Sequence, residues 1–326
     1  MSRPPELSAV VPCFNEQEVI VETHRRLTAV LREAARDYEL VFVNDGSRDT
    51  TLPRLRQIHI LDPHVRVVSL SRNFGHQLAV SAGLRHAEGE AVVVIDADLQ
   101  DPPEVIPAML EKWRAGCDVV YGVRRSRAGE SWFKLLTAKW FYRLLNRIAD
   151  TQIPADTGDF RLLSRRALDA LLQMGETHRL LRGMSSWIGF SQYGLAYDRG
   201  PRFAGATKYP LSKMLKLALD GVLSFSTLPL RLASFLGVAT AFAGGLGLMG
   251  AFFLHAFAAV SPSGWILLLL AMLLLGGMQL LGLGILGEYV GRIYTEARRR
   301  PLYVVEEVLE RRVQECEPQR AGGASA

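Results

Sequence analysis

The sequence predicts an α/β domain with a mostly parallel, doubly wound sheet, followed by a hairpin of two transmembrane helices. Short apolar runs alternate with longer helical stretches in the first part of the 326-residue chain, and two long stretches without charged side chains follow. The runs predicted to be strands are residues 7–14, 40–43, 65–70, 91–95 and 119–120. The intervals between them are long enough for the crossover helices that parallel strands need.

Two uncharged stretches predict the hairpin. Residues 233–260 and 265–287 contain no Asp, Glu, Lys or Arg, and each exceeds the roughly 20 helical residues that cross a hydrocarbon core of about 30 Å. The Ser-Pro-Ser-Gly segment at 261–264 is long enough only for a turn, so both flanks lie on one side of the membrane. Basic residues on both flanks predict that this side is cytoplasmic. A buried helical hairpin in a soluble domain is the alternative.

The composition divides the chain into five segments. These are a cytoplasmic catalytic domain (1–207), a juxtamembrane amphipathic segment (208–231), two transmembrane helices (232–260 and 264–288) and a cytoplasmic tail (289–326). No apolar signal sequence is recognised at the N-terminus, and the three cysteines have neither zinc nor disulfide spacing, which favours a reduced cytoplasmic compartment. The net charge of +5 lies largely beside the uncharged stretches, which favours anionic lipids over nucleic acid as partners.

Two carboxylates follow the fourth predicted strand. Asp96 and Asp98 lie one residue apart at its carboxyl end, where α/β sheets bind ligands. Alternate side chains of a strand share a face, so both can reach one site, where the like charges would repel each other without a cation between them. Hard divalent ions take such oxygen ligands together with phosphate oxygens. Capping of the next helix is the alternative, and it is the favoured reading for Asp101, which precedes Pro102.

Polar motifs follow three of the predicted strands. They are Val-Pro-Cys-Phe-Asn-Glu at 11–16, Val-Asn-Asp-Gly-Ser at 43–47 and Asp-Ala-Asp at 96–98, and further motifs lie at 73–77, 158–162 and 202–209. No GxGxxG follows the first predicted strand, which argues against a classical dinucleotide fold, and no GxxxxGK[ST] occurs, which argues against a P-loop ATPase. The motif set resembles the Rossmann-like GT-A core of family 2 inverting glycosyltransferases. It is most similar to the polyprenyl-phosphate group, which includes bactoprenol glucosyltransferases and dolichol-phosphate mannose synthases.

The resemblance implies a site for a nucleotide-sugar donor. Pro12, Phe14 and Glu16 would line the base and ribose pocket. Asp45 would accept hydrogen bonds from the base edge, since an ionised carboxylate is an acceptor only. A simple turn is the alternative for residues 44–47, because Asn, Asp, Gly and Ser all favour turns.

The resemblance also implies a metal cofactor, Mg²⁺ or Mn²⁺. Asp98 and Gln100 would bind the ion across the diphosphate, and Asp96 would hold the ribose or the metal. The ion would neutralise the leaving nucleotide.

Asp159 is the residue that the resemblance implies for orienting the acceptor, with Asp156 as the second candidate. A lipid phosphate is already largely ionised, because its second pKa lies near 6. We therefore expect Asp159 to position the nucleophile and to have only weak base character. Related mannose synthases can lack an acid at this position, and a loop cap is the alternative role.

Three cations complete the implied site. Arg161, Arg202 and Lys208 would hold phosphates, Arg through its bidentate fork and Lys as a point charge. We count Arg161 with Asp98 and Asp159 as the catalytic set, and Arg202 and Lys208 with the donor site. Solvated or headgroup-facing charges are the alternative for all three cations.

Two further segments, 132–145 and 209–223, combine apolar and basic residues at near-helical spacing, as helices at a membrane interface do. Core-facing amphipathic helices are the alternative.

Together these features predict transfer of one sugar, best guessed as glucose from UDP-glucose, onto undecaprenyl phosphate or another polyprenyl phosphate. The reaction would occur at the cytoplasmic face of the inner membrane, with two spans and both termini cytoplasmic. A UDP-amino sugar or GDP-mannose donor is the near alternative, and a non-catalytic membrane scaffold is the alternative of another class. A processive polysaccharide synthase is disfavoured, because no QxxRW motif occurs. A homo-oligomer is left open.

Overall fold

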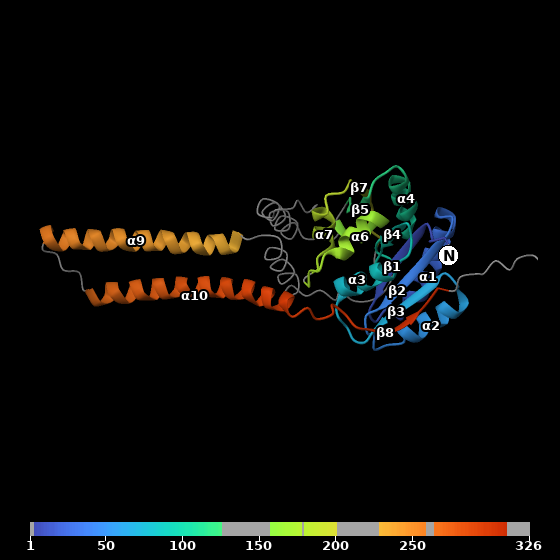
Figure 1. Ribbon diagram of the computed structural model, residues 1–326, viewed down its shortest axis with the longest axis horizontal. Helices are drawn as coiled ribbons and strands as arrows, with labels where there is room; N and C mark the ends of the chain where they lie inside the picture. Colours follow the sequence, from blue (N-terminus) through green and yellow to red (C-terminus); the bar gives the residue numbers. More distant parts are fainter. Residues whose placement is uncertain (1–2, 126–156, 178, 201–227, 259–263, 312–326) are drawn as a thin grey trace, which may run out of the picture. The chain divides into compact units, whose positions relative to one another are not determined.

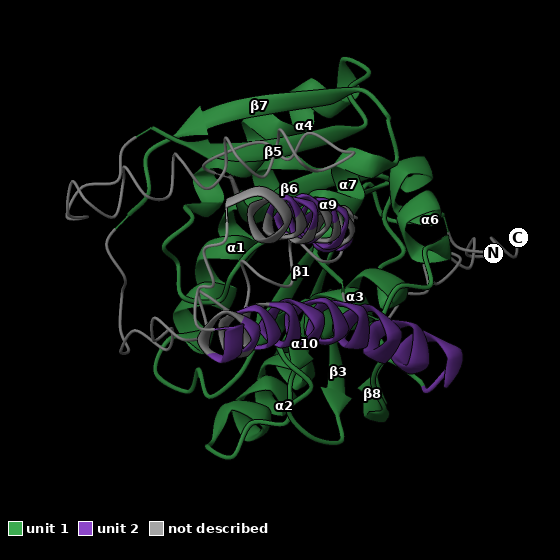
Figure 2. Cartoon of the chain, turned by 90° about the vertical axis from the view of Figure 1, so that its left-hand side faces the viewer, with its two compact units in different colours: residues 1–142, 151–208, 301–326 green, residues 143–150, 209–300 purple. Residues whose placement is uncertain are grey.

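A computed structural model gives the architecture of the chain in two compact units (Figure 1). The residues that it describes are 3–125, 157–177, 179–200, 228–258 and 264–311. Unit 1 takes its residues from 1–142, 151–208 and 301–326, and unit 2 takes its residues from 143–150 and 209–300 (Figure 2). The chain therefore passes from unit 1 into unit 2 and back twice.

Unit 1 is built on an eight-stranded sheet in the order β7-β5-β6-β4-β1-β2-β3-β8. The strands are β1 (Leu7–Cys13), β2 (Tyr38–Asn44), β3 (Val65–Leu70), β4 (Ala91–Val94), β5 (Val119–Arg124), β6 (Thr157–Ser164), β7 (Gln192–Tyr197) and β8 (Val305–Leu309). Four of the seven pairings are parallel: β1 with β2, β1 with β4, β2 with β3, and β5 with β7. The first five strands lie where the apolar runs predict them, and the mostly parallel α/β sheet is confirmed.

Helices cover both faces of this sheet (Figure 1). The helices α1 (Ile20–Ala34), α2 (Thr51–Leu61) and α4 (Ile106–Arg114) contribute buried side chains to one apolar cluster. The helices α3 (His76–His86), α6 (Arg165–Gln173) and α7 (Leu181–Trp187) contribute to a second cluster. A 3₁₀ turn, η1 (Pro103–Val105), precedes α4. Every residue of β1, β2 and β3 is buried, as expected for parallel strands covered on both faces.

Strand β8 lies within the segment predicted as a cytoplasmic tail, residues 289–326. It pairs antiparallel with β3 at the edge of the sheet, with Val67 opposite Leu309. Ion pairs from Arg56 to Glu307 at 2.6 Å and from Arg311 to Asp37 at 2.8 Å join this segment to the rest of unit 1. The tail thus contributes an edge strand to the sheet, although its mixed acidic and apolar sequence does not have the pattern of a buried strand.

Unit 2 contains the two long helices α9 (Leu228–Ala258) and α10 (Gly264–Ala297), which pack against each other. The predicted pair of helices is therefore present, and α10 continues past residue 288, where the prediction ended it. Among the described residues, no helix combines the length and the apolar character needed to cross a membrane. The membrane-spanning role of the pair stays a prediction.

Candidate active site

The parallel strands β1, β2 and β4 bring three polar loops to one edge of the sheet. Hydrogen bonds continue the pairing into the loops, from Asp45 N to Cys13 O at 2.9 Å and from Ile95 N to Val10 O at 3.1 Å. The motifs that follow these strands are consequently neighbours in space, although they are far apart in the sequence. This edge is where open α/β sheets bind ligands.

The loop after β1 is fastened to the loop after β2. Asn15 adopts a left-handed conformation with φ 54°, which Asn tolerates better than most residues. Its N–H donates to Ser47 Oγ at 3.0 Å, and its Oδ1 accepts from Arg48 N at 2.9 Å. Phe14 and Glu16, predicted to contact the nucleotide, flank Asn15 and are partly buried. Their binding role stays a prediction.

Asp45 is buried and fixes the loop that leads into α3. Its Oδ1 accepts from Phe74 N at 2.7 Å, and its Oδ2 accepts from Gly75 N at 3.0 Å. Burial raises the pKa of Asp45, and these two backbone bonds only partly offset that effect. Each carboxylate oxygen retains a second acceptor position, which could accept a hydrogen bond from a base edge. Recognition of the base by Asp45 stays a prediction. Pro12, the other predicted base contact, is buried within β1.

A cluster of acids surrounds His76 at the start of α3. Its Nε2 lies 3.1 Å from Asp159 Oδ2 and 3.7 Å from Asp96 Oδ1. Gln77, the next residue, donates from Nε2 to the same Asp159 oxygen at 2.6 Å. Strand β6 delivers Asp159 because it runs antiparallel beside β4, with Val94 opposite Arg161. The site thus joins the end of β4, the start of α3 and one strand, β6, that the sequence analysis did not predict.

The charges in this cluster are strongly coupled. Burial by itself would lower the pKa of His76, but the hydrogen bond to Asp159 and the nearby carboxylates raise this pKa to about 9. Burial would raise the pKa of Asp159, but the bond and charge of His76 hold this pKa well below its usual range. At neutral pH, His76 is therefore an imidazolium and Asp159 a carboxylate. The other Asp159 oxygen, Oδ1, is buried without a hydrogen-bond partner among the described residues.

The pKa of Asp96 is shifted upwards, opposite to that of Asp159. Burial, reinforced by the charges of Asp101, Asp159 and Asp98, raises the pKa of Asp96 to about 6, against the effect of His76. A divalent cation would relieve this repulsion, and carboxylate oxygens are the ligands that Mg²⁺ and Mn²⁺ prefer. The donor set therefore fits such an ion, held by few protein ligands together with substrate phosphates. In the described ranges, no group of three or more His, Cys, Asp or Glu side chains is placed so that it could hold a metal ion without further ligands.

The turn after β4 shapes the predicted metal loop. Asp98 Oδ1 accepts from Gln100 N at 3.1 Å, and Leu99 between them has φ 57°. Gln100 O accepts from Gly200 N at 2.9 Å, which ties the loop to the segment after β7. The loop is thus held from both sides, while metal binding by Asp98, Gln100 and Asp96 stays a prediction.

Comparison with known proteins identifies the family. The family model for glycosyl transferase family 2 matches residues 8–172, a range that contains Asp45, Asp96, Asp98 and Asp159. The chain belongs to glycosyl transferase family 2. The resemblance inferred from the strand-end motifs is confirmed, and so is the GT-A-like α/β fold.

Three similar proteins match this family 2 chain over nearly its whole length. Uncharacterized glycosyltransferase YkcC of Bacillus subtilis (strain 168) is 50% identical over 306 residues, which are 94% of this chain and 95% of YkcC. Bactoprenol glucosyl transferase of Shigella phage SfV is 41% identical over 302 residues, which are 92% of this chain and 98% of that protein. The prophage bactoprenol glucosyl transferase homolog of Escherichia coli (strain K12) is 40% identical over 310 residues, which are 93% and 99% of the two chains.

Arg161 of the family 2 site is held by contacts within the protein. Its side chain is buried, and its guanidinium donates to Leu181 O at 3.1 Å, to Gly158 O at 2.8 Å and to Ser185 Oγ. Burial lowers the pKa of Arg161 to about 10, while the charge of Asp159 opposes that shift. These contacts hold the guanidinium within the protein, and the expected phosphate contact stays a prediction. The alternation along β6 places Arg161 on the same face as Asp159, under α7.

Asp101 is not the helix cap that the sequence favoured. It is buried, and its carboxylate accepts a hydrogen bond from the Tyr197 hydroxyl, with Arg199 Nε 3.4 Å and Arg124 Nη2 3.9 Å away. No side-chain bond caps the turn that begins at Pro103. Asp101 thus joins the β4 loop to the ends of β5 and β7.

Several predicted features lie outside the described residues. They are Asp156, Arg202, Lys208 and the segments 132–145 and 209–223. Conversely, His76 and Gln77 belong to the site, although the sequence analysis gave them no role. The sequence feature that could have identified them is the motif at 73–77, which follows the third strand at the same edge of the sheet.

Proposed function

We propose that this chain is a metal-dependent, inverting glycosyltransferase that moves one sugar from a nucleotide donor to a polyprenyl phosphate. Glucose from UDP-glucose and undecaprenyl phosphate are the specific substrates that we propose. The carrying observation is the convergence of Asp96 and Asp159 on His76, at 3.7 and 3.1 Å, beside the loop that holds Asp98. Relatives at 40–41% identity that are named bactoprenol glucosyl transferase support this reaction.

The donor would bind across the ends of β1, β2 and β4. Pro12, Phe14, Glu16 and Asp45 would contact the base and ribose, and the cations Arg202 and Lys208 would contact the phosphates. Asp98, with Asp96 and Gln100, would hold Mg²⁺ or Mn²⁺. The ion would supply charge neutralisation for the departing nucleotide.

Asp159 would place the acceptor phosphate opposite the leaving nucleotide, as inversion requires. Its low pKa makes it a weak base. A weak base suffices, because the acceptor phosphate has a second pKa near 6 and is largely ionised at neutral pH. The His76 imidazolium, which lies between two carboxylates, would lessen their repulsion of an anionic acceptor.

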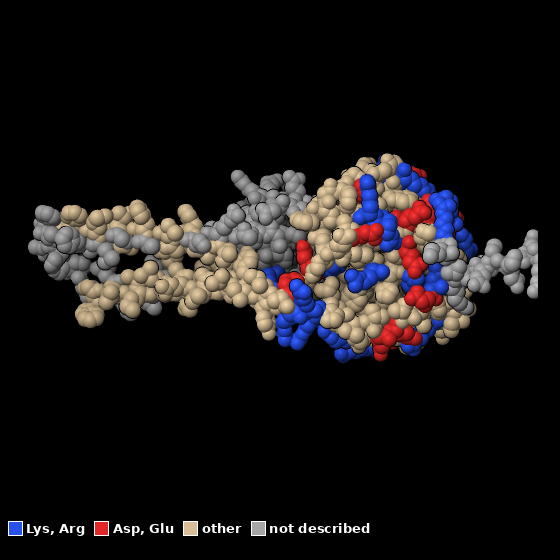
Figure 3. Space-filling view, in the orientation of Figure 1, with Lys and Arg blue, Asp and Glu red and all other residues tan. Residues whose placement is uncertain are grey.

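The acceptor would be reached at the cytoplasmic face of the membrane, with α9 and α10 as a two-span anchor. The support for this proposal is the absence of charged residues from 233–260 and 265–287. Where Figure 3 draws α9 and most of α10 in colour, the atoms belong to residues other than Lys, Arg, Asp and Glu. Large apolar side chains of unit 2 are exposed, with Phe242 at 69% and Trp265 at 82%. Acyl chains would cover them, and the basic flanks would contact anionic headgroups.

The experiment that tests the proposal uses the full chain with undecaprenyl phosphate, Mg²⁺ or Mn²⁺, and a panel of radiolabelled nucleotide sugars. Labelled lipid from UDP-glucose alone supports the specific proposal. Labelled lipid from a UDP-amino sugar or GDP-mannose keeps the reaction and corrects the donor. If no donor gives labelled lipid, the proposal is wrong and a non-catalytic role takes its place.

A further inference from the structure

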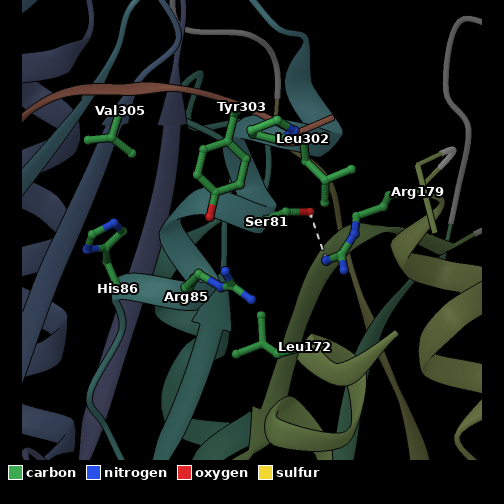
Figure 4. A pocket seen from close by; sticks show the side chains of 9 residues that line it. Ser81, Arg85, His86, Leu172, Arg179, Leu302, Tyr303 and Val305 are labelled. Carbon is green, nitrogen blue, oxygen red and sulfur yellow. Dashed lines mark hydrogen bonds between the residues drawn. The ribbon is translucent and has the colours of Figure 1, made fainter. Parts of the chain in front are cut away.

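A cavity of about 300 Å³ lies in unit 1, away from the acid cluster around His76. Its polar lining consists of Arg85, His86 and Ser81 from α3, Arg179 before α7, and Tyr303 before β8 (Figure 4). Leucine, valine and proline side chains form the rest of the wall. Arg85 lies nine residues after His76 on α3, which corresponds to about 13 Å along a helix. This cavity is therefore separate from the proposed donor site.

The cavity concentrates positive charge, and among the described residues no acidic side chain lines it. Arg179 is partly buried and donates to neutral acceptors: Glu176 O at 3.4 Å, Met174 O, and Ser81 Oγ at 3.4 Å. Burial, reinforced by the charge of Arg85, lowers the pKa of Arg179, and the nearby Tyr303 and the Glu176 charge do not fully offset this.

The charges around His86 are also mainly positive. Burial and the charges of Arg66 and Arg85 lower the pKa of His86, while Glu310 acts in the opposite direction. Glu310 lies outside the lining and pairs with Arg66 at 2.8 Å. The charge of Arg85 also favours the end of α3 through the helix dipole. That effect does not account for Arg179 and Tyr303, which come from other segments.

Two other places in unit 1 pair arginines with acidic side chains. A cavity of about 540 Å³ is lined by Arg36 and Arg114, and both pair with Glu6, which also lines it, at 3.3 and 2.8 Å. The buried Arg66 lies 2.6 Å from Glu88. The cavity at Arg179 differs from these places because its described lining includes cations but no carboxylate.

We propose that the cavity of Arg85, Arg179 and Tyr303 binds a phosphate-bearing ligand. Guanidinium groups pair with phosphate oxygens through two parallel hydrogen bonds. The hydroxyls of Ser81 and Tyr303 can donate further bonds, and the apolar wall can contact the organic part of a phosphate ester. A small phosphorylated metabolite and a phospholipid headgroup both offer this chemistry. The inference does not depend on the proposed transfer reaction.

The test is calorimetric titration of the full chain in a neutral detergent, with EDTA to suppress binding through divalent cations. The probes are inorganic phosphate, glycerol 3-phosphate and monomeric dihexanoyl phosphatidic acid. Arg85→Ala is expected to weaken binding about tenfold or more, because a charge-assisted bond is lost, and Arg85→Glu should abolish it. The matched control is Arg36→Ala, which changes an exposed arginine in the cavity that already holds Glu6.

The outcomes separate the sources of the phosphate. Binding of inorganic phosphate or glycerol 3-phosphate that is lost in Arg85→Glu supports a soluble ester, whereas the same loss for phosphatidic acid alone supports a lipid headgroup. Arg179→Gln is a second test variant for the same titrations, provided that thermal unfolding shows it to be folded. If no probe binds, or if Arg85→Glu binds as tightly as the wild type, the proposal is overturned.

Discussion

Gln77 Nε2 donates a hydrogen bond to Asp159 Oδ2 over 2.6 Å, and this contact joins the start of α3 to β6. The Oε1 of the same Gln77 side chain accepts from Leu181 N at 3.1 Å, at the start of α7. One amide therefore holds three elements around the proposed acceptor carboxylate. Groups held in this way keep their geometry before substrate arrives, which is what positioning requires.

The His76–Asp159 pair predicts a pH-dependent contribution to stability. The pKa of His76 is raised to about 9, so its contribution is complete below the unfolded value of about 6.5 and is lost as the pH rises through 9. Asp159 has a lowered pKa, so its contribution is present above about 3.9 and is lost at more acidic pH. His76→Gln should therefore destabilise the protein by about 1–3 kcal/mol near pH 5–6, and the deficit should shrink towards alkaline pH.

Thermal unfolding of wild type and His76→Gln between about pH 5 and pH 10 checks this. The matched comparison is Asp159→Asn with and without His76→Gln, in which the pH-dependent difference should be much smaller. A deficit that stays constant across this range would show that the pair does not contribute through its charges.

Asp45→Ala should reduce both stability and turnover. It removes the acceptor of two buried amide groups, those of Phe74 and Gly75, at a cost of about 1–3 kcal/mol. The loop that they fix leads directly into His76, so kcat should fall while the donor KM rises. Steady-state kinetics together with thermal unfolding give the answer. A rise in KM alone, at unchanged stability, would mean that Asp45 acts by contacting the nucleotide and not by fixing the loop.

Arg161→Met tests whether that arginine acts mainly through its contacts within the protein. Removal of a buried guanidinium that donates to Leu181 O and Gly158 O should lower the free energy of unfolding by about 2–4 kcal/mol. The control Arg25→Met removes an exposed ion pair with Glu22 and should cost less than about 1 kcal/mol. A raised donor KM with no loss of stability would restore the phosphate-binding role to Arg161.

Replacement of residues 228–300 by a long Gly/Ser linker tests the proposed anchor while β8 is retained. Nucleotide binding, measured by calorimetry, should persist, whereas lipid transfer in liposomes should fall sharply because the effective concentration of the acceptor drops. A chain that ends before residue 228 is the comparison. It also lacks β8, so the edge of β3 loses its partner and stability should fall further. Undiminished liposome transfer by the linker variant would exclude an anchoring role for α9 and α10.

The central strands could be predicted because they are buried on both faces and therefore appear as continuous apolar runs, as in β2 and β3. Strand β6 could not, because its Asp159 and Arg161 place charges on a face that is buried only through specific partners. Strand β8 carries two adjacent glutamates at an edge. Contacts between residues about 80 positions apart, such as Gln77 with Asp159, depend on the insertion of β6 between β4 and β5. The acids themselves could be chosen from motifs, but their partners could not.

The most direct test of the central claim is transfer of radiolabelled glucose from UDP-glucose to undecaprenyl phosphate in liposomes, comparing wild type with Asp98→Asn. The substitution preserves size and removes a carboxylate from the proposed metal site. The wild type should form labelled lipid only with Mg²⁺ or Mn²⁺ present, and Asp98→Asn should be slower by about a hundredfold or more, with an unchanged unfolding temperature. Equal rates for the two proteins in saturating metal would contradict the account, as would a complete absence of labelled lipid from the wild type.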